Sequence, residues 1–525
     1  MAPQQGVYSQ VGYGQPQPLE NTTYHGGPYV FGAGQTGPTG TAKYAMMQDD
    51  RYAQQKSEIY RAGCCVCQTC CLLFVLIVGG FCVVLYARLN EFQAWSVQHP
   101  GHPLARLYQP YLSVIEGYWA MNPLYLDGQR FKYGDVFMVS GQVLIGDFAT
   151  VEKALTSPQA RTTLLGASPM IVDHLPHRND DSLSFLLALS DKAAGGTGTH
   201  EAYRSALMKA IFNHNAVARQ DDATAEQMVR ELAFEYKTHM QQGKLDEFFD
   251  WSEKGWKRFN IRYIHYVLLG LDPRAEEATK LFIEAYYNPG GPMFYLEGLG
   301  NTPLAKPDLV KELLQNVVAR YVMSPAMTAA AQVWGAPEHM GLQSDEAARL
   351  LTSMMAIAAM QGPHGLGQRA LGYIKLPDYK GAHVESLTPP SEIDMTMQWD
   401  ALDLTNDEAI ELYILETARL YAPVSAVARV AQAPFTVWVA GYDREFPAGT
   451  LVNIPISMAN LDAGKWGPSR YDFNPNREHL KEWTMAFNMV GDRDAGRGCP
   501  GRDVSVQMLI DVLRELGNVR RQMRF

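Results

Sequence analysis

Hydrophobic positions follow helical spacing over most of the chain. From about residue 200 onward, apolar residues recur every three to four positions, as one buried face of a helix requires. Strand-like runs return only near Phe435–Val439 and Leu451–Ile454. Earlier, two apolar runs around a glycine within Lys132–Ile145 predict a hairpin, and Thr150 is expected to cap the short helix that follows. The pattern therefore predicts a body that is mainly α with small β-sheets.

One segment is apolar on every side rather than on one face. Residues 71–87 contain no charged or amide side chain, and extended back to Cys64 they reach about the 20 residues that a helix needs to cross a bilayer. No clear cleavage site of small residues follows, so a single transmembrane anchor over 63–88 is favoured over a signal peptide. The cysteines at 64–71 are interpreted as palmitoylation sites or as apolar filler, because a zinc site would need a second pair of ligands.

The anchor divides the chain into four parts. Residues 1–62 are rich in Gln, Gly, Tyr and Pro and are predicted to be a disordered tail. Residues 89–115 are a linker punctuated by proline and glycine, and residues 116–525 are long enough for one large catalytic domain. The net charge of −10 excludes a general nucleic-acid binder.

The orientation of the anchor is left open by the charges beside it. Arg51, Lys56 and Arg61 precede it and only Arg88 follows, which mildly favours a cytoplasmic tail. Glycosylation of the sequon at Asn21 would instead show a lumenal tail. We expect a single-pass protein of the endoplasmic reticulum or another endomembrane, with undetermined topology.

The seventh cysteine of the chain stands apart from the other six, which lie between residues 64 and 82. Cys499 is flanked by arginine and glycine and precedes a helix with an apolar stripe from Val504 to Leu516. The positive end of a helix dipole stabilises a thiolate, and a thiolate is the form of cysteine that binds metals. Cys499 is therefore the candidate metal ligand.

Two further motifs precede this cysteine in a fixed order. Glu416 and Arg419 stand three residues apart late in a helix that opens near Asn406, so they share one face and can pair. Arg477 ends the irregular run Phe473-Asn474-Pro475-Asn476-Arg477. Taken alone, each motif is compatible with an ordinary surface ion pair.

The order of these motifs resembles the cytochrome P-450 superfamily over about residues 116–525. The resemblance implies the P-450 fold and haem b as cofactor, with Cys499 as the thiolate ligand of the iron and Gly501 allowing the backbone close to the porphyrin. It also implies that Glu416, Arg419 and Arg477 form a buried ion triad. The propionate partners that it implies are Arg429 and Arg497, and His200 and Arg204 are either further propionate partners or ordinary surface residues.

The cysteine loop departs from the pattern of that superfamily. The positions seven and four residues before Cys499 usually hold Phe and Gly, but here they are Asp492 and Ala495, and the nearest phenylalanine is Phe487. The loop is therefore lengthened. In this respect it resembles the hydroperoxide-using branches, which are allene oxide synthase, hydroperoxide lyase and the fatty-acid peroxygenases.

The distal helix departs as well. Monooxygenases of the superfamily usually carry an acid–Thr pair there, but residues 358–365 contain neither, and Thr352 follows a leucine instead of an acid. Pro363 is expected to kink this helix. Gln361 either holds a hydroperoxide or only bonds a helix carbonyl at the kink, and His364 is the alternative polar group.

The sequence thus predicts a membrane-anchored haem-thiolate enzyme that rearranges or cleaves fatty-acid hydroperoxides without an external reductant. The alternatives are a monooxygenase that needs a reductase and hydroxylates a lipophilic substrate, and a haem-binding membrane protein without turnover. In the first two cases the partner is a lipophilic small molecule.

Overall fold

The structure is a computed structural model, and the part of the chain that it describes lies between residues 136 and 523. The described residues are 136–139, 142–156, 209, 211–251, 253–287, 307–334, 344–378, 391–423, 427–430, 434–439, 442–447, 450–487 and 498–523. The chain divides into two compact units, and every described residue belongs to the second. The predicted tail (1–62), anchor (63–88) and linker (89–115) lie outside the described residues. No helix of the described part is long and apolar enough to cross a membrane.

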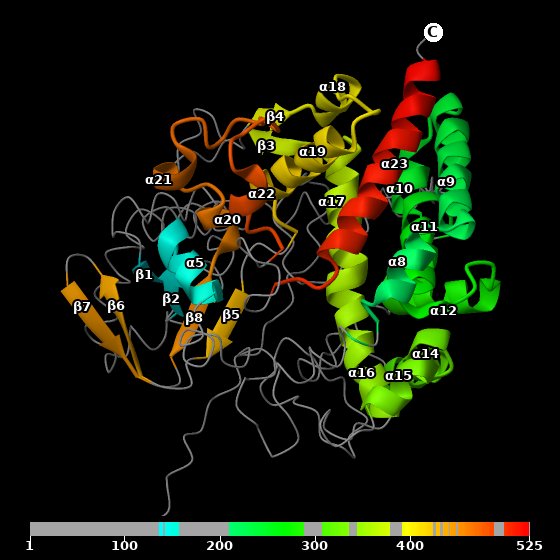
Figure 1. Ribbon diagram of the computed structural model, residues 1–525, viewed down its shortest axis with the longest axis horizontal. Helices are drawn as coiled ribbons and strands as arrows, with labels where there is room; N and C mark the ends of the chain where they lie inside the picture. Colours follow the sequence, from blue (N-terminus) through cyan, green and yellow to red (C-terminus); the bar gives the residue numbers. More distant parts are fainter. Residues whose placement is uncertain are drawn as a thin grey trace, which may run out of the picture. The chain divides into compact units, whose positions relative to one another are not determined.

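A set of packed helices forms one side of this unit (Figure 1). Helix α23 (Arg502–Met523) packs against α9 (Ala223–Gln241), and α9 packs in turn against α11 (Gly255–Leu269). The buried residues of α9 recur at helical spacing, from Ala225 through Met228, Leu232 and Tyr236. The short helices α8 (His214–Gln220) and α10 (Leu245–Asp250) join the same layer.

The distal helix is continuous from residue 344 to residue 370 but changes its winding in the middle. Helix α16 (Ser344–Met354) passes into a π-helical turn, η5 (Met355–Gln361), and then into α17 (Gly362–Ala370). A proline stands at the start of α17, and because it lacks an N–H it cannot continue the regular ladder. The disturbance expected at Pro363 therefore takes the form of a π-helical turn just before it.

Three more helices surround the distal helix. Helix α12 (Glu276–Tyr286) packs on α11, on α14 (Pro307–Val322) and on η5, and α14 and α15 (Pro325–Trp334) pack on α16. An aromatic cluster fills the space between α11, α12 and α14. Its central residue, His265, stacks on Phe282 at 3.9 Å between ring centroids, and its Nε2 lies 2.9 Å from the hydroxyl of Tyr321.

The burial of His265 predicts an acid-sensitive core. Burial lowers its pKa to about 3, and the hydrogen bond to the Ile261 carbonyl only partly opposes this. Because the pKa is lower in the folded than in the unfolded state, the unfolded state binds more protons, and stability falls as the pH drops below about 6.5. We expect this residue to remove about 2 kcal/mol of unfolding free energy between pH 7 and pH 5.

Urea unfolding at the two pH values checks this expectation. The variant His265→Asn keeps hydrogen-bonding capacity but does not titrate in this range, so it should lose that part of the pH dependence. An equal fall in stability in both proteins would contradict the assignment.

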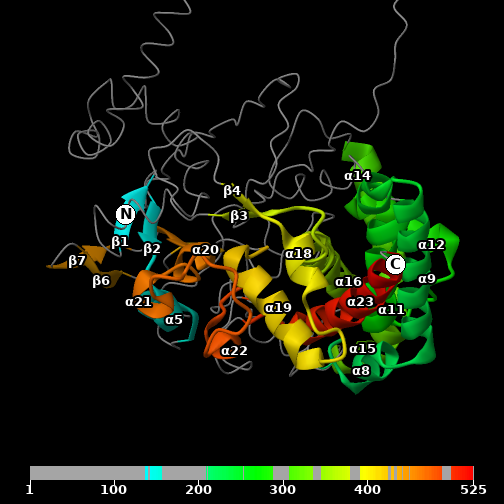
Figure 2. The same cartoon turned by 90° about the horizontal axis from the view of Figure 1, so that it is seen from above.

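The C-terminal half supplies the helices next to the cysteine. Helix α19 (Asp407–Leu420) begins at Asn406, whose side chain accepts from the N–H groups of Glu408 and Ala409, so the predicted helix start is confirmed. It packs on both α17 and α23 (Figure 1; Figure 2). The other described helices of this half are α18 (Met395–Asp400), α20 (Ile456–Ala459), α21 (Ala463–Trp466) and α22 (Leu480–Trp483).

The strands form small sheets beside the helices. One sheet has the order β1 (Val136–Val139), β2 (Gln142–Ile145), β8 (Leu451–Ile454), β5 (Val427–Val430), with β2 and β8 parallel. The others are two-stranded pairs, β3 (Leu376–Asp378) with β4 (Ser391–Ile393), and β6 (Phe435–Val439) with β7 (Tyr442–Phe446). The predicted hairpin and both predicted C-terminal strands are confirmed. So is the mainly helical class.

The predicted cap of the first short helix was wrong. Helix α5 (Phe148–Thr156) begins before Thr150, and the side chain of Asp147 accepts a hydrogen bond from the Thr150 N–H at 2.7 Å. Asp147 stands ahead of the first turn, where a carboxylate satisfies free N–H groups and also meets the positive end of the dipole. Thr150 is therefore a residue of the first turn.

Candidate functional site

Cys499 lies three residues before α23. It is half-buried, and its N–H donates to the Phe487 carbonyl at 2.8 Å. The carbonyl of Cys499 in turn accepts from the Arg502 N–H at 3.4 Å, at the first residue of the helix. The structure confirms the predicted position before the N-terminus of a long helix, and such a position favours a thiolate over a thiol.

Gly501 follows the cysteine at the entry of the helix. Its carbonyl accepts from the Ser505 N–H at 2.9 Å. A Cβ added at Gly501 would lie 3.6 Å from the ring of Phe212, which is an ordinary van der Waals contact. No described contact therefore requires glycine here, and its role against a porphyrin stays a prediction.

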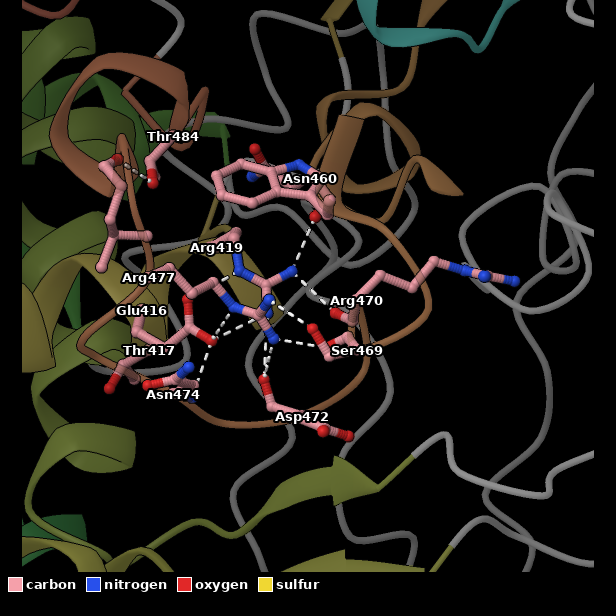
Figure 3. A network of polar contacts seen from close by, with 12 residues as sticks. Glu416, Thr417, Arg419, Asn460, Ser469, Arg470, Asp472, Asn474, Arg477 and Thr484 are labelled. Carbon is pink, nitrogen blue, oxygen red and sulfur yellow. Dashed lines mark hydrogen bonds and ion pairs between the residues drawn. The ribbon is translucent and has the colours of Figure 1, made fainter. Parts of the chain in front are cut away.

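The Glu416–Arg419–Arg477 triad is present and buried (Figure 3). Arg419 donates to both carboxylate oxygens of Glu416, from Nε at 2.7 Å and from Nη2 at 2.8 Å. Arg477 donates from Nε to Glu416 Oε1 at 2.9 Å. The side chains of Glu416 and Arg419 are 0% exposed and that of Arg477 is 7% exposed, so solvent does not screen this network.

The remaining donors of the two arginines hold an irregular segment in place. Arg419 Nη1 donates to the carbonyls of Asn460 and Arg470, each at 2.8 Å, and Arg477 Nη2 donates to the Asp472 carbonyl at 2.7 Å. Burial lowers the pKa of Arg419, and the Glu416 carboxylate opposes that shift. The triad therefore fixes backbone carbonyls as well as charges.

This segment leads from the triad to the cysteine. The side chain of Asn460 accepts from the Met485 N–H at 2.9 Å, and two residues later Phe487 provides the carbonyl that receives the Cys499 N–H. The triad thus supports the ligand loop through the backbone of residues 460–487. Asn460 was not singled out from the sequence, because an asparagine in an irregular segment gives no periodic signal.

Gln361 bonds the end of α12, and His364 packs against α11 and the residue just after α12. The Nε2 of Gln361 donates to the Tyr286 carbonyl at 3.1 Å. His364 is buried, with its ring stacked on Trp256 and tilted against Tyr287, at centroid distances of 6.4 and 5.2 Å. Its Nδ1 has no hydrogen-bond partner among the described residues. Their catalytic roles stay predictions.

The hydroxyl of Thr352 is bonded within its own helix. The residue is completely buried, and its hydroxyl donates to the Ala348 carbonyl one turn earlier at 2.8 Å. A hydroxyl bonded in this way is used within its own helix.

The predicted propionate partners lie beyond what the structure describes. His200, Arg204 and Arg497 are outside the described residues. Arg429 stands in β5, opposite Val452 of β8, and only its backbone is described.

Short matches connect this chain to plant proteins. Over 68 residues it is 44% identical to cytochrome P450 714C2 of Oryza sativa subsp. japonica and 40% identical to cytochrome P450 709B1 of Arabidopsis thaliana. Each match covers 13% of this chain and 12% of the relative, so the chain aligns with only about an eighth of the length of these relatives. No protein-family model matches the chain.

Solved structures match over a much larger part. CalO2 is 14% identical with a TM-score of 0.51, over 75% of this chain and 88% of that one. Cytochrome P450 CYP109B1 from Bacillus subtilis is 14% identical with a TM-score of 0.48, over 76% of this chain and 92% of that one. The likeness to CalO2 shows the fold alone: the described chain has the P450 fold, mainly helical with small sheets.

Haem with a cysteine thiolate ligand is the cofactor that these comparisons imply. The residues present fit that group. Cys499 is half-buried and lies at the positive end of α23. On the distal helix, a Cβ added at Gly362 would meet no described atom within 4 Å, so there is open space beside η5. One soft ligand and an uncrowded helix face suit a flat iron porphyrin.

Proposed function

We propose that the protein is a haem-thiolate enzyme that rearranges or cleaves fatty-acid hydroperoxides without an external reductant. One observation carries the proposal. From Met355 to Gly365 the distal helix contains no acid and no Thr, and the nearby Thr352 hydroxyl is bonded to its own helix. Dioxygen chemistry needs two electrons and two protons, whereas a hydroperoxide arrives already reduced. The lack of an acid or threonine in this stretch of the distal helix therefore favours the peroxide.

The roles of the residues follow from this chemistry. A haem bound through Cys499 supplies an iron that can break the O–O bond, and the triad and Phe487 hold its ligand loop. Burial lowers the pKa of His364 well below its usual value, and the charges of Lys257 and Arg369 act in the same direction. The imidazole is therefore neutral at working pH and can accept or donate a hydrogen bond without supplying an extra proton.

The substrate class follows from the same proposal. The predicted anchor would hold the enzyme at an endomembrane, beside lipophilic substrates in the bilayer. The proposed activity is either that of a hydroperoxide isomerase, which rearranges the substrate, or that of a hydroperoxide lyase, which cleaves it. A monooxygenase that needs a reductase is the outcome that would replace it.

The proposal predicts a difference between two variants of the distal helix. Gln361→Leu removes the bond to the Tyr286 carbonyl and the amide next to the open face, so hydroperoxide turnover should fall about tenfold. Thr352→Val changes a buried hydroxyl on the same helix that takes no part in the proposed chemistry, so turnover should change less than about twofold.

Both variants are compared with the unchanged protein by anaerobic consumption of a linoleic acid hydroperoxide without NADPH. Epoxide, allene oxide or aldehyde products are expected. The reverse order, with Thr352→Val impaired and Gln361→Leu unaffected, would indicate a hydroxyl-dependent proton relay and would overturn the proposal.

A further inference from the structure

The carbonyl of Met360, within the π-helical turn η5, accepts hydrogen bonds from two other helical regions. Asn260 of α11 donates to it from Nδ2 at 3.0 Å. Tyr287, just after α12, donates from its hydroxyl at 3.2 Å. The two donors are also joined to each other, because Asn260 Nδ2 lies 2.6 Å from the Tyr287 oxygen. These three groups form a closed set that we term the Met360 clamp.

The side-chain amide of Asn260 makes both of its described donor bonds within the clamp, while its Oδ1 has no hydrogen-bond partner among the described residues. The side chain of Asn260 is 0% exposed. Its neighbours in the sequence, Phe259 and Ile261, are also buried residues of α11. A buried amide without hydrogen bonds is costly, and both donor bonds recorded for this amide belong to the clamp. A leucine would fill the same space without that requirement.

The π-helical turn also donates a hydrogen bond to the end of α12. Gln361, the last residue of η5, donates to the Tyr286 carbonyl, while the next residue, Tyr287, donates to Met360. Bonds therefore run in both directions between the end of α12 and the turn. A π-helical turn is rare and is usually kept where it serves a site, and open space lies next to it at Gly362.

We propose that Asn260 and Tyr287 are positioning residues that hold the π-helical turn and thereby keep protons away from the bound hydroperoxide, so that its O–O bond breaks by homolysis. This inference rests on the proposed peroxide function. The clamp bonds the Met360 carbonyl inside the protein, so that this carbonyl does not bind water. Without the clamp the π-helical turn relaxes, and the Met360 carbonyl binds water instead of Asn260 and Tyr287. That water supplies protons to the bound hydroperoxide.

The two modes of cleavage differ in electrons and protons. In homolysis each oxygen keeps one electron of the broken bond and an alkoxyl radical departs; a bound haem would supply the one further electron that the hydroxyl fragment requires. In heterolysis both electrons leave with the alkoxy oxygen, which must gain a proton to depart as the alcohol; a bound haem would supply the two electrons that the remaining oxygen requires. Only the second mode needs a proton at the departing oxygen.

Amide hydrogen exchange tests the Met360 clamp without any measurement of enzyme activity. In the haem-loaded protein, Tyr287→Phe and Asn260→Leu should each make amide hydrogen exchange in residues 355–362 about fivefold to tenfold faster. Tyr263→Phe is the matched control. It removes a buried hydroxyl from the same helix, α11, but that hydroxyl contacts Gln220 and not the distal helix. Unchanged exchange in both clamp variants would overturn the proposal.

Cumene hydroperoxide then reports the mode of cleavage, because homolysis yields acetophenone and heterolysis yields 2-phenyl-2-propanol. Each clamp variant should raise the ratio of alcohol to ketone about threefold or more, and Tyr263→Phe should leave it unchanged. Faster exchange with an unchanged ratio would overturn the role in cleavage. If the unchanged protein does not consume the peroxide at all, the proposed function fails, while the exchange result still decides the clamp.

Discussion

Cys499→Ser protein is expected to lose thiolate ligation of haem. A serine hydroxyl stays protonated near neutral pH and does not donate electron density as a thiolate does, so hydroperoxide turnover should fall more than about a hundredfold. The ferrous–CO spectrum should lose the band typical of thiolate-ligated haem. The backbone bond from residue 499 to the Phe487 carbonyl does not involve the side chain, so the loop can keep its shape.

Cys82→Ser provides the matched control, since it makes the same chemical change far from α23 in the sequence. Its haem spectrum should equal that of the unchanged protein. A Cys499→Ser protein that kept the thiolate band would show that the ligand is another residue.

Glu416→Gln is expected to lower the free energy of unfolding by about 3–5 kcal/mol, because it leaves two buried guanidinium groups without their carboxylate. Glu416 accepts from Arg419 and Arg477 and also from the Asn474 N–H at 2.9 Å, and glutamine keeps the size but not the charge. Chemical denaturation followed by tryptophan fluorescence measures the loss.

Glu408→Gln is the control on the same helix. Glu408 is 70% exposed and pairs with Lys481 at 3.2 Å, so its loss should cost less than about 1 kcal/mol. If Glu416→Gln gives no soluble protein, Arg477→Met is the second variant, expected to cost less because the Glu416–Arg419 pair survives. Equal, small effects of Glu416→Gln and Glu408→Gln would show that the triad does not stabilise the fold.

The sequence predicted those parts of the site that depend on local spacing. Glu416 and Arg419 pair because they stand three residues apart on a helix, and Cys499 lies at a helix N-terminus because an apolar stripe follows it. The carbonyl partners of the triad could not be predicted. They belong to an irregular segment, where no periodic pattern indicates which backbone groups turn inward.

The distal helix marks the limit of such prediction. Proline chemistry predicts that the helix is disturbed at Pro363, but not that the disturbance is a π-helical turn. That form is fixed by Asn260 and Tyr287, which stand far away in the sequence. In the same way, the hairpin β1–β2 follows from local pattern, while the parallel pairing of β2 with β8 depends on the folded core.

The central claim is that the protein acts on a peroxide and not on dioxygen. The most direct measurement gives purified haem-loaded protein a fatty-acid hydroperoxide under anaerobic conditions, without NADPH or a reductase, and follows substrate loss and products. We predict many turnovers to epoxide, allene oxide or aldehyde. An unconsumed hydroperoxide, together with oxidation of a lipophilic substrate when NADPH, a reductase and dioxygen are supplied, would contradict the claim.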